Sequence, residues 1–246
     1  MATDAILTLD EVVSGYGKMT ILHGTSFSVA RGAITTVIGP NGAGKSTVFK
    51  TVFGMLPARA GRVTFEGAEI TNLQPRDLLT RGISYVPQGR NIFPELSVRH
   101  NLELGAVMAA KDFDLAGRMD AAMDRFPVLR RKANAQASTL SGGEQKMLEI
   151  ARALLLEPKL MMIDEPSIGL SPILVNELFA TLTGMRDRGI TVLMIEQNAK
   201  RALEVSEYGI VLELGRTRIA DTAKAILADP RIGQLFLGGG LAEKVA

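Results

Sequence analysis

The chain has 246 residues, of which 46% are hydrophobic, and its 28 Lys and Arg residues against 26 Asp and Glu residues leave a net charge of +2. It contains no cysteine and two histidines, which excludes a disulfide framework and a thiolate metal site and disfavours a histidine-based metal centre. Because charges of both signs are spread along the sequence, no nucleic-acid partner is expected.

The N-terminal residues 1–13 lack a basic region followed by an apolar one, so no export signal is expected. The longest uncharged apolar runs, at 104–110 and 190–195, are far shorter than the roughly 20 residues that cross a bilayer. We therefore expect that the chain does not span a membrane by itself.

Three short segments, 6–9, 26–29 and 62–67, alternate apolar and polar side chains as half-buried strands do. They predict an antiparallel sheet beside a buried strand at 33–38. Between the first two segments lies Tyr16, flanked by two glycines. Its ring is either a surface turn residue or a flat face that stacks on a purine base, and these residues alone favour neither interpretation.

The next stretch fits the phosphate-binding pattern GxxxxGK[ST] and lies between a strand pattern and a helix pattern, the context that such a loop requires. Its glycines let backbone N–H groups turn toward a polyphosphate, and the following helix presents its positive end. Lys45 would reach the β- and γ-phosphates, and Ser46 would bind Mg²⁺. The alternative is a Gly-rich turn before an ordinary helix. The predicted phosphate loop comprises Gly39, Pro40, Asn41, Gly42, Ala43, Gly44, Lys45, Ser46 and Thr47.

A further short strand is predicted at 83–86, and helical periodicity dominates after it, from about residue 91 to 157. This block predicts a helical subdomain that is inserted between two strands of a core formed by residues 1–90 and 158–246.

The helical block contains the run LSGGEQ at 140–145, where Ser141 and Glu144 have the spacing of a capping box. The capping box does not explain Gly142 and Gly143, because two glycines cost backbone entropy unless something approaches the backbone closely. A phosphate group is the natural candidate for a Gly-Gly helix start.

An apolar run at 160–163 has the character of a buried parallel strand and is followed at once by Asp164 and Glu165. Carboxylates at the carboxyl end of a core strand lie where α/β sheets place ligands. Asp164 could hold Mg²⁺ through water, while Glu165 could polarise an attacking water. The alternative is a polar strand end that faces solvent.

The remaining pattern predicts a helix that Ser171 caps and Pro172 begins, and then a buried strand at 190–195. A hairpin of 208–214 and 216–220 is expected to turn at Gly215, with short helices to the C-terminus.

GPNGAGKST (39–47), Gln88, LSGGEQ (140–145) and LMMIDE (160–165), in this order and spacing, resemble the ATP-binding subunit of an ABC transporter over essentially the whole chain. The resemblance implies one ABC ATPase domain over 1–246, which binds ATP and Mg²⁺. Its α/β fold would have a P-loop NTPase core with a mostly parallel sheet, an antiparallel β-subdomain and an inserted helical subdomain.

The resemblance also implies roles for single residues. Tyr16 would stack on adenine, Gln88 would sense Mg²⁺ and the γ-phosphate, and Glu165 would activate water. The signature segment (140–145) would contact, in a head-to-tail dimer, the ATP held by a second ATPase subunit, identical or different, through Ser141, Gly142, Gly143 and Glu144.

Two positions depart from the general family pattern. Gln197 stands where most members have a catalytic histidine, and Ser171 stands where most have an aspartate. Glutamine can hydrogen-bond a phosphate or a water but cannot take up a proton. The ATP site built on this chain is therefore expected to hydrolyse ATP more slowly than its partner site.

The segments 85–102, 140–172 and 195–215 look like the smaller ATPase subunit of branched-chain amino acid importers, a group that also includes urea and short-chain amide systems. The resemblance implies membrane permease subunits, contacted by the segment from Gln88 to Ser97, and a periplasmic solute-binding protein that acts indirectly. An apolar tip of Ile92, Phe93 and Pro94 marks that contact. The location would be peripheral, on the cytoplasmic face of the inner membrane. The alternative from another class is a soluble ABC ATPase that is not coupled to transport.

Overall fold

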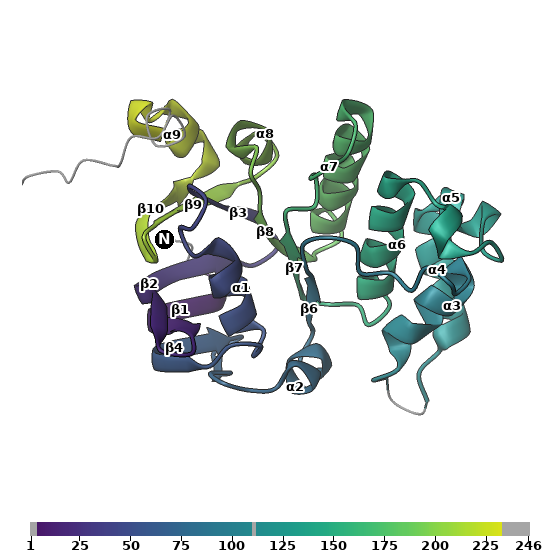
Figure 1. Cartoon of the computed structure of the whole chain (residues 1–246), viewed down its shortest axis with the longest axis horizontal. Helices are drawn as coiled ribbons and strands as arrows, with labels where there is room; N and C mark the ends of the chain where they lie inside the picture. Colours follow the sequence, from purple (N-terminus) through teal and green to yellow (C-terminus); the bar gives the residue numbers. More distant parts are fainter. Residues whose placement is uncertain (1–3, 110–111, 233–246) are drawn as a thin grey trace, which may run out of the picture.

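The computed structural model describes residues 4–109 and 112–232, which form two sheets with helices around them (Figure 1). One sheet has four strands in the order β2-β1-β4-β5, and the other has six in the order β10-β9-β3-β8-β7-β6. Among the described residues, no helix combines the length and the apolar character needed to cross a membrane.

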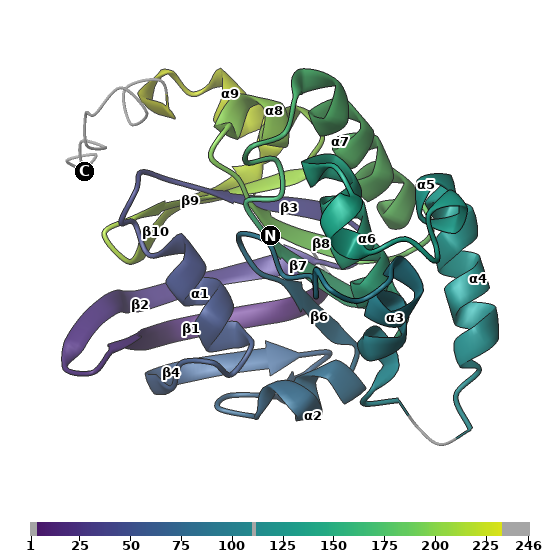
Figure 2. The ribbon, with the colours of Figure 1, turned by 45° about the vertical axis from the view of Figure 1, so that its right-hand side comes forward.

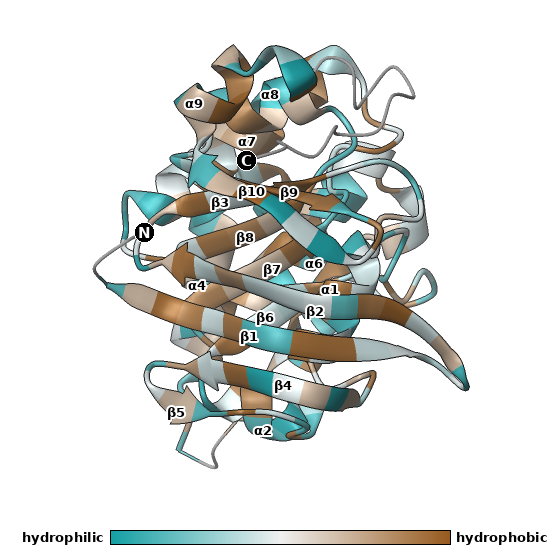
Figure 3. Ribbon diagram, turned by 90° about the vertical axis from the view of Figure 1, so that its left-hand side faces the viewer, coloured by the Kyte–Doolittle hydropathy of each residue, from teal (hydrophilic) through white to brown (hydrophobic). Residues whose placement is uncertain are grey.

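The four-stranded sheet is antiparallel, as predicted, and consists of β1 (Ala5–Tyr16), β2 (Met19–Ala30), β4 (Ala58–Phe65) and β5 (Ala68–Glu69). Figure 3 shows brown alternating with paler or teal residues along β1 and β2, the pattern of strands with one buried face.

The first two strands are much longer than the sequence predicts. Pairing between β1 and β2 shifts register at several points, including between Leu9 and Val12 and between Ser14 and Gly15. Such bulges let a strand continue where strict alternation breaks, so periodicity finds only a regular stretch near one end of each strand. Tyr16 is the last residue of β1, directly before the turn that leads into β2.

The six-stranded sheet confirms the predicted mostly parallel core. Every residue of three neighbouring strands is buried, as expected where both faces are covered. Only β10 runs antiparallel to its neighbour. The strands are β3 (Ile34–Ile38), β6 (Ile83–Val86), β7 (Leu160–Asp164), β8 (Thr191–Ile195), β9 (Tyr208–Glu213) and β10 (Arg216–Thr222).

Helix α1 (Lys45–Val52) lies between the two sheets (Figure 2). Its Phe49 is fully buried in a cluster that also holds Leu9 of β1 and Leu193 of β8. Burial of such a side chain contributes about 1.5–3 kcal/mol, so this packing holds α1 against both sheets.

The chain between β6 and β7 is helical, as predicted, and no strand occurs in the described part of residues 87–159. Its elements are α3 (Val98–Glu103), a 3₁₀ turn (Leu104–Ala106), α4 (Leu115–Arg125), α5 (Pro127–Arg131), a second 3₁₀ turn (Ala137–Thr139) and α6 (Gly142–Leu154). The other helices are α2 (Pro75–Thr80), α7 (Pro172–Arg186), α8 (Ala199–Glu204) and α9 (Ala223–Ala228). The rest of the expected C-terminal helical region, residues 233–246, lies outside the described residues.

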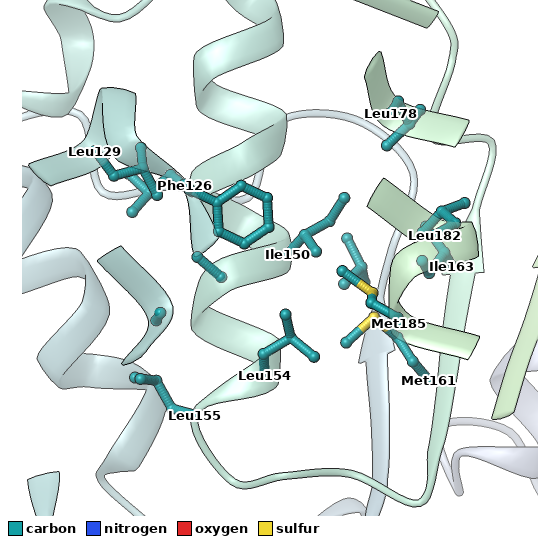
Figure 4. Packing of buried hydrophobic residues seen from close by; sticks show 14 of the residues in the cluster. Phe126, Leu129, Ile150, Leu154, Leu155, Met161, Ile163, Leu178, Leu182 and Met185 are labelled. Atoms are coloured by element: carbon teal, nitrogen blue, oxygen red, sulfur yellow. The ribbon is translucent and has the colours of Figure 1, made fainter. Parts of the chain in front are cut away.

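These helices share one hydrophobic cluster with the sheet. Figure 4 shows Ile150 and Leu154 of α6 facing Met161 of β7 and Met185 of α7. The subdomain is inserted in the sequence, but its packing is continuous with the core. Its bounds at about 91 and 157 stay a prediction.

Candidate active site

The phosphate loop is fixed by contacts within the chain. A Cβ atom on Gly39 would lie 2.1 Å from the carbonyl oxygen of Leu212, so only glycine lets the loop approach β9 this closely. Gly44, the N-cap of α1, has a φ of 99° and offers no side chain to the first amides of the helix. The free amides at the start of α1 therefore form an anion site.

Lys45 is buried inside the loop that precedes it. Its Nζ donates to the carbonyl oxygens of Gly39 at 2.8 Å and Pro40 at 3.1 Å. Burial lowers the pKa of Lys45, while the charges of Glu165 and Asp164 act in the opposite direction. The cation is thus held within the loop, beside the anion site of α1.

Asp164 ends β7 with a side chain that is 1% exposed. The hydroxyl of Tyr85 donates to its Oδ2 at 3.4 Å, while its Oδ1 has no hydrogen-bond partner. Burial raises the pKa of Asp164, and hydrogen bonds from Ser46 and Tyr85 oppose that effect. A buried carboxylate oxygen without a partner is costly unless a cation or another ligand completes it.

The hydroxyl of Ser46 and the carboxylate of Asp164 are suitable oxygen ligands for Mg²⁺. Magnesium binds oxygen, and in nucleotide sites one or two protein ligands and the phosphates share its coordination. Ser46 and Asp164 supply a hydroxyl and a carboxylate. Among the described residues, no group of three or more His, Cys, Asp or Glu side chains could hold a metal ion unaided.

Glu165 follows Asp164 in the left-handed backbone conformation, with a φ of 47° that is strained for a residue other than glycine. Its backbone N–H donates to the carbonyl oxygen of Ile195 at 3.0 Å. The side-chain Nε2 of Gln88 donates to Glu165 Oε2 at 2.7 Å. The structure therefore brings together two residues that are 77 positions apart and that the sequence analysis placed in one site.

A cavity of about 440 Å³ connects most of these groups. Its lining includes the loop residues 41–47, Gln88, Glu165 and Gln197. The phosphate loop, Gln88, Glu165 and Gln197 thus meet around one cavity, although they lie far apart in the sequence.

Tyr16 does not line this cavity and is 43% exposed at the end of β1. The Nζ of Lys50, on α1, lies 5.6 Å from the centre of its ring and donates to its hydroxyl at 3.4 Å. The ring is therefore held beside the phosphate-loop helix, where its stacking role stays a prediction.

The signature segment forms the predicted capping box at the start of α6. The Ser141 N–H donates to Glu144 Oε2 at 2.8 Å, and the Glu144 N–H donates to Ser141 Oγ at 3.4 Å. Lys132 also donates to the Glu144 carboxylate at 2.8 Å. Burial disfavours ionisation of Glu144, but these hydrogen bonds hold its pKa below the ordinary value.

The structure gives Gly143 a neighbour within the chain besides any ligand. A Cβ atom on Gly143 would lie 2.7 Å from the end of the half-buried Leu174 side chain of α7, so that side chain would have to shift to admit an alanine. A Cβ atom on Gly142 would meet nothing within 4 Å. Of the two glycines, only Gly142 has no neighbour in the chain that a larger residue would meet. None of the signature residues lines the 440 Å³ cavity.

Glu196 is a site residue to which the sequence analysis gave no role. It is 1% exposed and accepts hydrogen bonds from the Ser167 N–H at 2.9 Å, the Ser167 hydroxyl at 2.7 Å and the Gln197 N–H at 3.1 Å. Burial raises its pKa, and these donors oppose the shift. Glu196 thus links Ser167, in the loop that follows Glu165, to the backbone of Gln197. A carboxylate directly after an apolar strand was the signal in the sequence.

Comparison with known proteins gives a consistent result. A family model described as "ABC transporter" matches residues 22–168. The high-affinity branched-chain amino acid transport ATP-binding protein BraG of Pseudomonas aeruginosa is 42% identical over 95% of this chain and 100% of that protein. The probable branched-chain amino acid transport ATP-binding protein LivF of Archaeoglobus fulgidus is 39% identical over 92% of this chain and 95% of that protein. The lipopolysaccharide export system ATP-binding protein LptB of Haemophilus influenzae is 32% identical over 95% and 98%.

Solved structures show the same architecture. The ATP-binding cassette MJ1267 of an ABC transporter superposes with a TM-score of 0.87 at 30% identity, over 95% of this chain and 99% of that one. The ADP conformation of MJ1267 gives a TM-score of 0.85 at 31% identity, over 96% and 100%.

Proposed function

Because this chain belongs to the ABC transporter family, as an ATPase subunit that binds nucleotide, we propose that it powers the import of branched-chain amino acids. The observation that carries the proposal is the 42% identity with BraG over the full length of that protein. The relative named for lipopolysaccharide export is less similar, at 32%. An importer of urea or short-chain amides and an ABC ATPase not coupled to transport are the alternatives.

We propose that ATP binds with its phosphates on the amides of α1 and on Lys45. Because Lys45 is buried away from bulk water, it would neutralise phosphate charge more strongly than an exposed lysine. Mg²⁺ held by Ser46 and Asp164, with Gln88 nearby, would supply further neutralisation of the phosphate oxygens.

Glu165 is the proposed general base, which takes a proton from the attacking water. Gln88 occupies one of its two carboxylate oxygens with a hydrogen bond of 2.7 Å. That oxygen is therefore less accessible to the proton of the attacking water than it would be without Gln88. Movement of Gln88 toward the γ-phosphate would free this oxygen, and Glu196 would hold the backbone of Gln197 beside the cavity.

As a member of this family, the chain acts with membrane permease subunits and a second ATPase domain. We propose a head-to-tail dimer in which Ser141, Gly142, Gly143 and Glu144 close over the ATP of the other subunit. Two observations support a contact with another chain. A Cβ atom on Gly142 would meet nothing within 4 Å, and the signature segment does not line the chain's own cavity.

The proposed permease contact lies on a groove of about 200 Å³ whose lining includes Pro87, Asn91, Leu104 and Met108. Large apolar side chains are exposed around it, and Phe93 is 50% exposed. Its neighbour Ile92 packs against the core cluster, so the tip is narrower than the three residues predicted from the sequence. A short amphipathic helix from a permease would bury this surface. The contact between this chain and the permease would lie on the cytoplasmic face of the inner membrane.

The test is a reconstituted transporter that carries Phe93→Asp, with Leu227→Asp as the control at an exposed apolar residue on α9. We expect transport and stimulation of ATPase activity by liganded binding protein to fall at least about tenfold, while basal ATPase activity stays within about twofold. Loss of basal and stimulated activity together would assign Phe93 a folding role. Comparing leucine-loaded with urea-loaded binding proteins distinguishes the two importer classes.

A further inference from the structure

Helix α6 contains a buried ion pair that the site described above does not use. Lys146 and Glu149 are one helical turn apart, their side chains are 9% and 2% exposed, and their charged atoms are 2.5 Å apart. Removing two charges from water is costly, and an apolar pair of similar volume would often stabilise a fold as well or better. The pair is therefore better explained by what its atoms contact than by stability.

Both members of the pair contact the backbone of the segment that follows Gln88. The Lys146 ammonium donates to the carbonyl oxygen of Gly89 at 3.1 Å, and the N–H of Asn91 donates to Glu149 Oε1 at 2.5 Å. One turn further along the same face of α6, the Arg152 guanidinium donates to the carbonyl oxygen of Asn91.

Further hydrogen bonds hold the residues on either side of these contacts with α6. The Asn91 side chain donates to the carbonyl oxygens of Pro87 at 3.2 Å and Gln88 at 3.3 Å. The N–H of Phe93 donates to the side chain of Asn101, on α3, at 2.8 Å. Gln88, at one end, contacts Glu165, and Phe93, at the other end, is exposed beside the groove.

We propose that Lys146 and Glu149 are positioning residues that fasten residues 89–91 to α6, so that Gln88, the groove and the signature segment at the start of α6 move as one body. The inference rests on the proposed function, because it assigns the route by which a permease bound at the groove displaces the signature segment. Glu149 and Arg152 themselves line that groove, so a bound helix would press on the attachment directly.

Two variants separate the ion pair from its backbone contacts. Lys146→Glu with Glu149→Lys keeps opposite charges at the same spacing but loses both contacts, because lysine cannot accept the Asn91 N–H and glutamate cannot donate to Gly89. Lys146→Gln with Glu149→Gln, the double-glutamine variant, removes the ion pair but keeps a donor for the carbonyl oxygen of Gly89 and an acceptor for the Asn91 N–H. The control is the charge exchange Arg201→Glu with Glu204→Arg, an exposed pair of the same spacing on α8.

The first measurement is hydrogen exchange of the peptide 88–97 in the full chain, together with thermal unfolding. We expect the charge exchange to speed amide exchange of this peptide at least about tenfold, and the double-glutamine variant and the α8 control to leave it near the parent rate. Unchanged exchange in the charge-exchange variant, or fast exchange in the double-glutamine variant alone, would overturn the proposal.

The second measurement is the ratio of stimulated to basal ATPase activity in the reconstituted transporter. We expect this ratio to fall about tenfold in the charge-exchange variant and to be retained in the double-glutamine variant. If exchange of the peptide responds as expected but the parent shows no stimulation by permease and binding protein, then the proposed function fails while the fastening by Lys146 and Glu149 stands.

Discussion

Helices α1 and α6 both begin in glycine-rich segments, but side chains of the chain itself cap only the start of α6. At α1, Gly44 gives no side-chain cap, and Lys45 is folded back onto the carbonyl oxygens of its own loop. At α6, Ser141 and Glu144 already satisfy each other's amides, and only the surroundings of Gly142 are open. A helix start without a cap is a full anion site, whereas a capped one with a bare glycine can add only a few contacts to an anion held elsewhere.

The largest expected effect tests the chemistry beside α1. Glu165→Gln should reduce single-turnover ATP hydrolysis by about 10²–10⁴-fold, because the amide cannot accept the proton of the attacking water. ATP binding should be spared, since the phosphate contacts of α1 and Lys45 remain. Glu177→Gln, on the exposed face of α7, is the control. An ordinary rate in Glu165→Gln would remove Glu165 as the base.

The next effect tests α6 and separates its two glycines. Gly142→Ala should leave the thermal unfolding midpoint unchanged and weaken ATP-dependent dimerisation about tenfold, because its Cβ atom meets nothing in the chain but would enter the proposed contact.

Gly143→Ala should lose most of the roughly 0.5–1 kcal/mol that alanine normally gains over glycine in a helix, since the new Cβ atom pushes the Leu174 side chain aside. Adding Leu174→Ala should restore part of that loss. If the two alanine variants behaved alike in both unfolding and dimerisation, the distinction between the two glycines would not hold.

A smaller effect concerns Gln197, which lines the cavity of α1. Gln197→His should raise the rate of turnover at this chain's own ATP site by a few fold, because histidine can take up a proton where glutamine can only hydrogen-bond. The rate is best measured in dimers whose other site is disabled by Glu165→Gln or its equivalent. An unchanged rate would count against a slow site.

The smallest effect is on stability and depends on pH. Because burial raises the pKa of Asp164, the folded chain binds its proton more tightly than the unfolded chain does, so stability falls as pH rises from about 4 through the raised pKa. Asp164→Asn removes that loss. Without nucleotide, the unfolding midpoint of Asp164→Asn should exceed that of the parent at neutral pH. The difference should be about 2–4 °C for each kcal/mol by which the buried charge lowers the free energy of unfolding, and it should vanish below about pH 4. A difference that stayed constant with pH would exclude the buried charge as its cause.

Most of the core could be predicted from the sequence, because β3, β7 and β8 are continuous apolar runs and α1 follows a recognisable loop. The lengths of β1 and β2 could not, since bulges interrupt the alternation on which the prediction rests. The sequence also named Gln88, Glu165 and Gln197, but their meeting in one cavity depends on how the ends of β6, β7 and β8 lie side by side.

The sequence by itself determined the chemistry of this protein, because a phosphate loop, a capping box and a carboxylate after a strand depend on residues that are adjacent or nearly so. Tertiary structure alone decided that Gly143 packs on Leu174 and that Glu149 holds Asn91, 58 positions away. Such contacts leave no local period in the sequence, since they are fixed by the approach of whole helices and strands whose packing depends on the entire core.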